Sequence, residues 1–119
     1  MIGKIKDVLQ GKAPLQAKRS PRWSSVRKHH LQKNPTCAAC GDTDKLEVHH
    51  IQPFHTHPEL ELEPSNLISL CESKSYGIIC HLLIGHNGNY KLINPNVVGD
   101  SEEWLQKLSD AKKWLNINL

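Results

Sequence analysis

Two adjacent histidines, His49 and His50, close the short alternating segment LEVHHI at residues 46–51. One imidazole can bind a metal ion that neutralises charge at a phosphodiester, while a second, neutral imidazole accepts a proton from water near pH 7. Adjacent histidines can divide these tasks. Alternation along a strand predicts that Val48 points inward and His49 outward, and it sends neighbouring side chains to opposite faces. The backbone at His50 must therefore depart from ideal strand geometry if both rings serve one site.

An asparagine further along the chain is suited to hold such a departure in place. Its side chain carries both a hydrogen-bond donor and an acceptor, so it can bridge the backbone of the loop that follows His50. Asn66 opens the second apolar run, NLISL at residues 66–70, and is therefore a candidate to brace that loop.

Four cysteines predict a second kind of site. Cys37 and Cys40 have two residues between them and are followed by glycine, which is the spacing at which two thiolates bind one tetrahedral zinc ion. Cys71 and Cys80 form a wider pair with eight residues between them, which implies an insertion. We predict a closed structural zinc site with four cysteine ligands. In the alternative, Cys71 or Cys80 is an ordinary buried cysteine and a histidine is the fourth ligand.

Length and composition predict one small domain. The chain has 119 residues, of which 38% are hydrophobic, so its core is modest and a metal ion would help to stabilise it. It contains no run of about 18 apolar residues and no signal-peptide pattern, so we expect no membrane segment and a cytoplasmic location. In a reducing compartment, the cysteines favour metal binding over disulfides.

Positive charge is concentrated at the N-terminal end. Residues 1–34 contain nine Lys and Arg against one Asp, whereas residues 35–70 contain one Lys against six acidic residues. A basic segment joined to a near-neutral body is suited to bind a polyanion such as nucleic acid. Alternatively, the basic segment is only a tail that increases solubility. The residues expected to contact phosphates are Arg19, Arg22, Arg27 and Lys28.

The expected elements are short. Residues 1–20 are expected to be a basic arm, with a short helix near residues 2–10, and residues 21–119 a single domain. Ser20 and Ser101 are suited to cap helices, and Gly85 is suited to end one. The expected helices cover residues 20–35, 78–84 and 101–117, and the expected strands cover residues 45–51 and 66–70, with a proline-rich loop between them.

Four segments in this order resemble one family. CAACG, LEVHHIQP, SNLISLC and CHLLIGH together resemble the HNH endonuclease superfamily, also called ββα-metal or His-Me finger nucleases, over residues 21–96. The resemblance implies an α+β fold: a small ββα-metal finger with a structural four-cysteine zinc site, flanked by N-terminal and C-terminal helices. The stretch around residues 81–97 is similar to small stand-alone members, many of which are carried by bacteriophages.

The resemblance also implies a role for each site residue. His49 and His81 are expected to bind a catalytic divalent metal, His50 to act as general base, and Asn66 to hold the loop that aligns His50. His86 lies five residues after His81, whereas a further metal-binding histidine in the family usually lies four residues on. His86 is therefore either a metal ligand or a substrate contact.

The function implied is metal-dependent hydrolysis of DNA phosphodiester bonds, by nicking or cutting. Imidazole ligands do not select magnesium strongly, so we expect Mg²⁺ or Mn²⁺ in the catalytic site, with Ni²⁺, Co²⁺ or Zn²⁺ also compatible. The expected partners are double-stranded DNA and other phage DNA-processing proteins, and the expected state is a monomer or weak dimer. The alternative is a non-catalytic zinc ribbon that binds nucleic acid and holds no second, exchangeable metal ion.

Overall fold

The computed structural model describes residues 18–118; the predicted helix near residues 2–10 and most of the basic arm lie outside this range. The described elements are helix α2 (Trp23–Lys33), strands β1 (Leu46–His50) and β2 (Leu67–Cys71), a π-helix η3 (His81–Gly85) and helix α3 (Val97–Asn118). Two short 3-10 turns, Pro58–Leu60 and Pro64–Asn66, lie in the loop between the strands.

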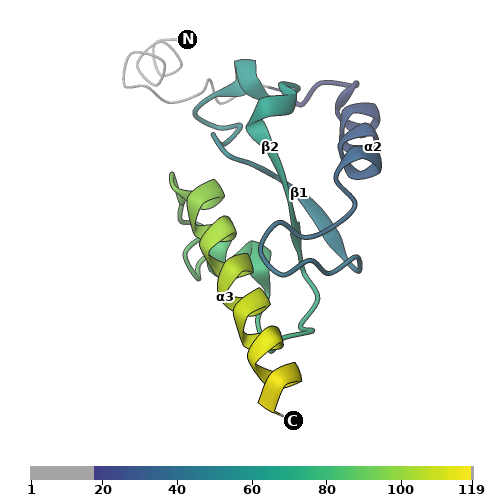
Figure 1. Ribbon diagram of the computed structural model, residues 1–119. Coiled ribbons are helices and arrows are strands. Elements are labelled where there is room, and N and C mark those ends of the chain that lie inside the picture. The colour runs from purple at the N-terminus through teal and green to yellow at the C-terminus, as the bar shows by residue number, and fades with distance from the viewer. Residues whose placement is uncertain (1–17, 119) are drawn as a thin grey trace.

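The two strands form an antiparallel hairpin in which Leu46 pairs with Cys71 and His50 pairs with Leu67. A two-stranded sheet is marginal by itself in water, so other elements must cover it. Helix α2 contacts both strands, and η3 also contacts both strands and packs against α3. Figure 1 shows α2 on one side of the hairpin and α3 on the other. This arrangement confirms the predicted α+β fold of the ββα-metal type.

The core is small and contains the four cysteines. Leu70 and Val97 are fully buried beside Cys37, Cys71 and Cys80. Partly buried side chains from α3, among them Trp104 and Leu108, pack against this cluster. Burial of so few large side chains gives only a few kcal/mol each, roughly 1.5–3 for a Val or Leu. The cysteine cluster therefore lies where an added stabilising ion would have the greatest effect.

Helix α3 begins at Val97, four residues before the predicted start, so the prediction that Ser101 caps it is wrong. Ser101 is buried inside the helix. The helix begins earlier because two asparagines organise the preceding turn: the side-chain amides of Asn94 and Asn96 each donate to the Asp100 carboxylate at 2.8 Å. A carboxylate in the first turn also interacts favourably with the helix dipole.

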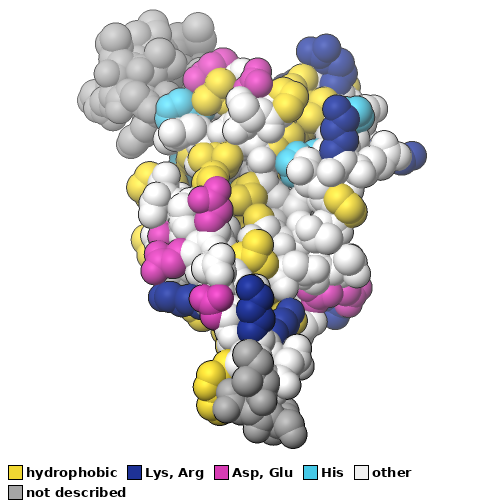
Figure 2. Space-filling model, viewed as in Figure 1, with side chains coloured by type: hydrophobic (Ala, Val, Ile, Leu, Met, Phe, Trp, Pro, Cys, Tyr) yellow, Lys and Arg dark blue, Asp and Glu magenta, His cyan; other side chains and the backbone are white. Residues whose placement is uncertain are grey.

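Charge is unevenly distributed over the described surface. In Figure 2, Lys and Arg side chains lie at the upper right of the view and again near its lower end, and Asp and Glu side chains lie at the top, along one flank and at the lower end. Within residues 18–118, no helix has the length and apolar character needed to cross a lipid bilayer.

Candidate metal centres and active site

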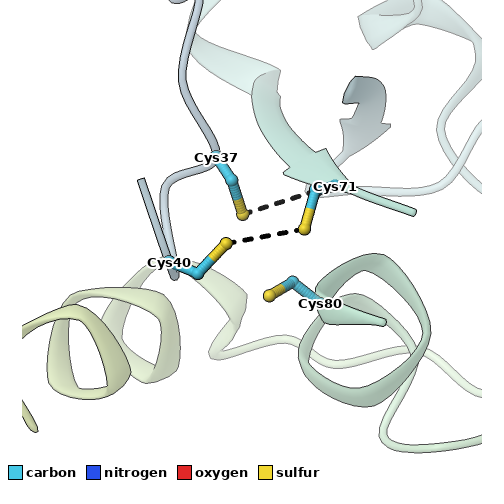
Figure 3. A group of neighbouring side chains, drawn as sticks. All are labelled: Cys37, Cys40, Cys71 and Cys80. Atoms are coloured by element: carbon cyan, nitrogen blue, oxygen red, sulfur yellow. Dashed lines mark hydrogen bonds between the residues drawn. The ribbon is translucent and has the colours of Figure 1, made fainter. Parts of the chain in front are cut away.

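The four cysteines converge on one point (Figure 3). Their sulfur atoms all lie within 4.8 Å of one another, and all four residues are buried. The sulfurs of Cys40 and Cys71 are 3.5 Å apart. Four thiolates around a zinc ion at about 2.3 Å are separated by roughly 3.8 Å in a tetrahedron. The cluster therefore has the donor set and the size of a structural zinc site.

The chemistry of the thiols also fits a cation. A hydrogen bond with Cys80, supported by backbone N–H groups, lowers the pKa of Cys37 to about 5, whereas burial raises the pKa of Cys40 to about 12. The hydrogen bond with Cys37, together with burial, raises the pKa of Cys80. One thiolate is thus favoured and its neighbours resist ionisation. A bound divalent cation would supply the positive charge that allows all four to ionise.

The wide spacing between Cys71 and Cys80 is accommodated by a loop that is tied back to the first cysteine pair. The carboxylate of Asp42 accepts hydrogen bonds from the hydroxyls of Ser73, at 2.6 Å, and Ser75. These bonds lower the pKa of Asp42 to about 2. The inserted residues therefore pack against the turn that carries Cys37 and Cys40. Cys71 and Cys80, at the two ends of the insertion, both reach the cluster.

Three histidines form a second convergent group. His49 comes from β1, and His81 and His86 come from η3 and the residue that follows it. The Nε2 atom of His81 is 3.2 Å from Nδ1 of His49 and 3.2 Å from Nε2 of His86. Imidazole nitrogens that share a metal ion at about 2.0–2.1 Å lie roughly 3.0–3.4 Å apart, depending on the geometry. The three rings therefore fit a single divalent cation.

The π-helix explains why His86 joins this group although it lies five residues after His81. In an α-helix, five residues turn through about 500°, which would leave the two side chains roughly 140° apart around the axis. A π-helix has more residues per turn and brings positions five apart onto nearly the same side. The structure therefore places His86 with His49 and His81.

Hydrogen bonds to Nδ1 of His81 and of His86 leave the Nε2 lone pair of each ring directed at the point where the three histidines converge. The Nδ1 atom of His81 lies 2.6 Å from a carboxylate oxygen of Glu72, and Nδ1 of His86 lies 2.9 Å from the backbone oxygen of Leu92. A carboxylate and a carbonyl can only accept, so both rings carry hydrogen on Nδ1 and present a bare Nε2. Each ring thereby has the tautomer that a metal ligand needs.

His49 is buried, not turned outward as strand alternation predicts, because η3 covers that face of the hairpin. The pKa of His49 is lowered to about 3, mainly by burial and in part by the positive charges that neighbouring histidines would carry. Neutral imidazole is the form that binds a metal. Gly85 makes the close packing possible, because a Cβ atom there would lie only 3.1 Å from Leu70 and 3.2 Å from His81.

His50 lies beside this group but makes different contacts. Its Nε2 atom is 2.9 Å from the backbone oxygen of Glu61, so the neutral ring carries hydrogen on Nε2 and leaves Nδ1 as an acceptor. The indole of Trp23 covers the ring at a centroid distance of 4.6 Å. Burial lowers the pKa of His50 below its ordinary value. The ring is therefore neutral, held in one orientation, and able to accept a proton.

The side chain of Asn66 bridges the loop that follows His50. Its Oδ1 accepts from the backbone N–H of Gln52 at 2.7 Å, and its Nδ2 donates to the backbone oxygens of Gln52 and Leu60 at 3.0 and 3.1 Å. Leu60 directly precedes the residue whose carbonyl accepts from His50. Asn66 thus fixes the backbone of the loop that follows His50. It also fixes the backbone next to Glu61, whose carbonyl oxygen orients the His50 ring.

A cleft of about 360 Å³ opens over the histidines. His49, His50, His81 and His86 all line it, and Arg19 is the one predicted phosphate contact among its lining residues. The Arg19 guanidinium lies 4.3 Å from the ring centre of Phe54 and 3.4 Å from the Glu61 carboxylate. The other predicted phosphate contacts do not line the cleft: Arg27 pairs with Glu47 at 3.5 Å, and Arg22 and Lys28 are exposed elsewhere.

Two residues of the site had no functional signal in the sequence. Glu72 directly follows Cys71 and reads as part of a polar turn, yet its carboxylate contacts His81. Gly85 reads as a helix stop, yet its lack of a side chain makes room for two histidines. Both roles depend on contacts between segments, which local residue patterns do not encode.

Comparison with known families agrees with this geometry. The chain matches the family model described as HNH endonuclease over residues 37–83, a range that includes all four cysteines, both adjacent histidines and His81. No curated protein and no solved structure matches the chain.

Proposed function

Because residues 37–83 match the HNH endonuclease family model, we propose that this protein is a metal-dependent DNA endonuclease that hydrolyses phosphodiester bonds with His50 as general base. The observation that carries the proposal is the division of roles within one cleft: three histidines turn towards a common point, and the fourth is held apart by Glu61 and Trp23. A zinc ribbon that only binds nucleic acid has no need of this arrangement. Nicking of supercoiled plasmid in the presence of divalent metals tests it.

The metal would be held by His49, His81 and His86. A divalent cation bound there would neutralise charge on the scissile phosphate and on the leaving oxygen. Mg²⁺ and Mn²⁺ are the proposed physiological ions, and an all-imidazole ligand set also accepts Ni²⁺, Co²⁺ or Zn²⁺. The cysteine cluster would hold a separate structural zinc that takes no part in the chemistry.

His50 performs the proton transfer in this proposal. Nδ1 accepts a proton from a water molecule as its oxygen attacks phosphorus in line with the 3′ oxygen. The new bond joins the water oxygen to phosphorus, the bond to the 3′ oxygen breaks, and the leaving oxygen takes a proton from solvent. The products are a 5′-phosphate and a 3′-hydroxyl. Asn66 contributes by keeping the loops on both sides of His50 in place.

The pH dependence of nicking should have an acid limb governed by His50. Burial lowers the pKa of this ring, so it stays in its proton-accepting form below its ordinary pKa of about 6.5. At saturating metal, the rate is expected to reach half its maximum at a pH below about 6.5 and to fall as pH decreases further. A rate that stays constant down to about pH 4.5 would contradict the assignment.

Arg19 is the proposed phosphate contact inside the cleft. Replacing it with alanine is expected to weaken DNA binding and to lower the slope of log affinity against log salt by about one, because one phosphate contact is lost. Fluorescence anisotropy with a labelled duplex at several salt concentrations measures both quantities. Lys113→Ala, which removes an exposed charge on α3, is the matched control. Equal slopes for the two variants would remove Arg19 from the DNA contact.

A further inference from the structure

A carboxylate and a tyrosine lie directly behind one of the metal-facing histidines. Glu72 accepts from Nδ1 of His81 at 2.6 Å, and the hydroxyl of Tyr90 lies 3.0 and 2.9 Å from the two carboxylate oxygens of the same glutamate. The ring of Tyr90 also contacts the rings of His81 and His86, at centroid distances of 5.7 and 5.3 Å. The tyrosine therefore contacts the carboxylate and two of the three converging rings.

The segment that contains Tyr90 also orients the other histidine from η3. The backbone oxygen of Leu92, two residues after Tyr90, accepts from Nδ1 of His86 at 2.9 Å. Residues 90–92 thus restrain His81 through Glu72 and His86 directly. The third ring, His49, is fixed independently by its place in β1. The orientation of the His81 and His86 rings relative to His49 therefore depends on this one exposed segment.

The arrangement differs from an ordinary surface ion pair. The side chains of His81 and Glu72 are only 16% and 32% exposed. Half-exposed Tyr90 could satisfy its hydroxyl with water, yet it lies within hydrogen-bonding distance of both carboxylate oxygens. This contact restricts rotation of the carboxylate and fixes the direction of the hydrogen bond to His81.

We propose that Glu72 and Tyr90 are positioning residues that set the affinity of the three-histidine site for its exchangeable metal ion. The proposal rests on the proposed function and assigns these two side chains to it. A charged acceptor on Nδ1 fixes the tautomer of His81 and increases the electron density at Nε2, which makes the ring a stronger ligand. Tyr90 holds the acceptor in the orientation that this effect requires.

Titration of zinc-loaded protein with Co²⁺ tests the proposal without any assay of activity. The visible absorption of bound Co²⁺ gives its affinity, and the absence of thiolate-to-cobalt charge transfer confirms that the cysteine site keeps its zinc. Glu72→Ala is expected to weaken Co²⁺ binding by about 10- to 100-fold. Glu72→Gln, which keeps an acceptor but loses the charge, should fall between Ala and wild type. Tyr90→Phe should weaken binding less than Glu72→Ala.

Thermal unfolding of the same zinc-loaded variants separates positioning from a structural role. Unfolding temperature and zinc content should match those of Glu103→Gln, a control that removes an exposed carboxylate paired with Lys107 on α3. Co²⁺ affinity in Glu72→Ala within about twofold of wild type would overturn the proposal. A loss of Co²⁺ affinity that occurs only together with loss of zinc and of the folded structure would overturn it as well. If the wild-type protein binds no Co²⁺ outside the cysteines, the metal site of the proposed function fails as well.

Discussion

Replacing His50 with alanine is expected to lower the rate of plasmid nicking by about 100- to 10,000-fold, the range that a general base contributes. The ring lines the cleft, is held by Glu61 and Trp23, and is separate from the three rings that would face the metal. Its loss should therefore remove proton transfer and leave both metal sites intact. Single-turnover rates on supercoiled plasmid, at saturating Mn²⁺, measure the effect.

His55→Ala is the matched control, because His55 is an exposed histidine that lines the same cleft. Its nicking rate should stay within about threefold of wild type, since no proton transfer is assigned to it. Zinc content and Co²⁺ affinity should be unchanged in both variants. Wild-type activity in a folded, zinc-loaded His50→Ala protein would refute the assignment of the general base.

Replacing Cys80 with serine is expected to abolish the stable fold. Structural zinc sites contribute roughly 10–16 kcal/mol of apparent binding free energy, which is as large as the whole stability of a typical domain at about 5–15 kcal/mol. Here the cysteines also form much of the buried core. Circular dichroism on heating and zinc content by atomic emission measure the outcome. The variant should contain less than one zinc ion per chain and show no cooperative unfolding transition.

Lys74→Ala provides the control, because Lys74 is exposed in the loop that joins Cys71 to Cys80. It should keep zinc and unfold at the wild-type temperature. A chelator should also separate the two metal sites in wild-type protein: activity should stop at EDTA concentrations that leave the fold intact, and unfolding should follow only when zinc is removed. A Cys80→Ser variant with full zinc and unchanged stability would show that Cys80 is not a ligand of the structural zinc.

The strands and the helical segments were largely predictable because their signals are local. Apolar alternation identified β1, a short β-branched and Leu-rich run identified β2, and the spacing of Cys37 and Cys40 identified a metal-binding turn. The start of α3 was misplaced because it depends on hydrogen bonds among Asn94, Asn96 and Asp100, which a capping rule based on Ser101 does not consider.

The histidines of the candidate site stand out in the sequence, but their geometry and the contacts that position them do not. His86 had two open roles because spacing rules assume an α-helix, whereas η3 is a π-helix that brings His86 to His81. Glu72 and Tyr90 were not recognised as a pair because they meet only after the segments that carry them have folded together. The positioning of ligands is encoded in these contacts between segments.

The central claim is that this chain hydrolyses DNA with a metal ion distinct from its structural zinc. The most direct measurement is the conversion of supercoiled plasmid to nicked circles by zinc-loaded protein, stripped of other metals, as Mn²⁺ is added. We predict no conversion without Mn²⁺ and a saturable rise with it, which gives ends with a 5′-phosphate and a 3′-hydroxyl. Folded, zinc-loaded protein that leaves the plasmid supercoiled at every concentration of Mn²⁺ and of Mg²⁺ would contradict the account.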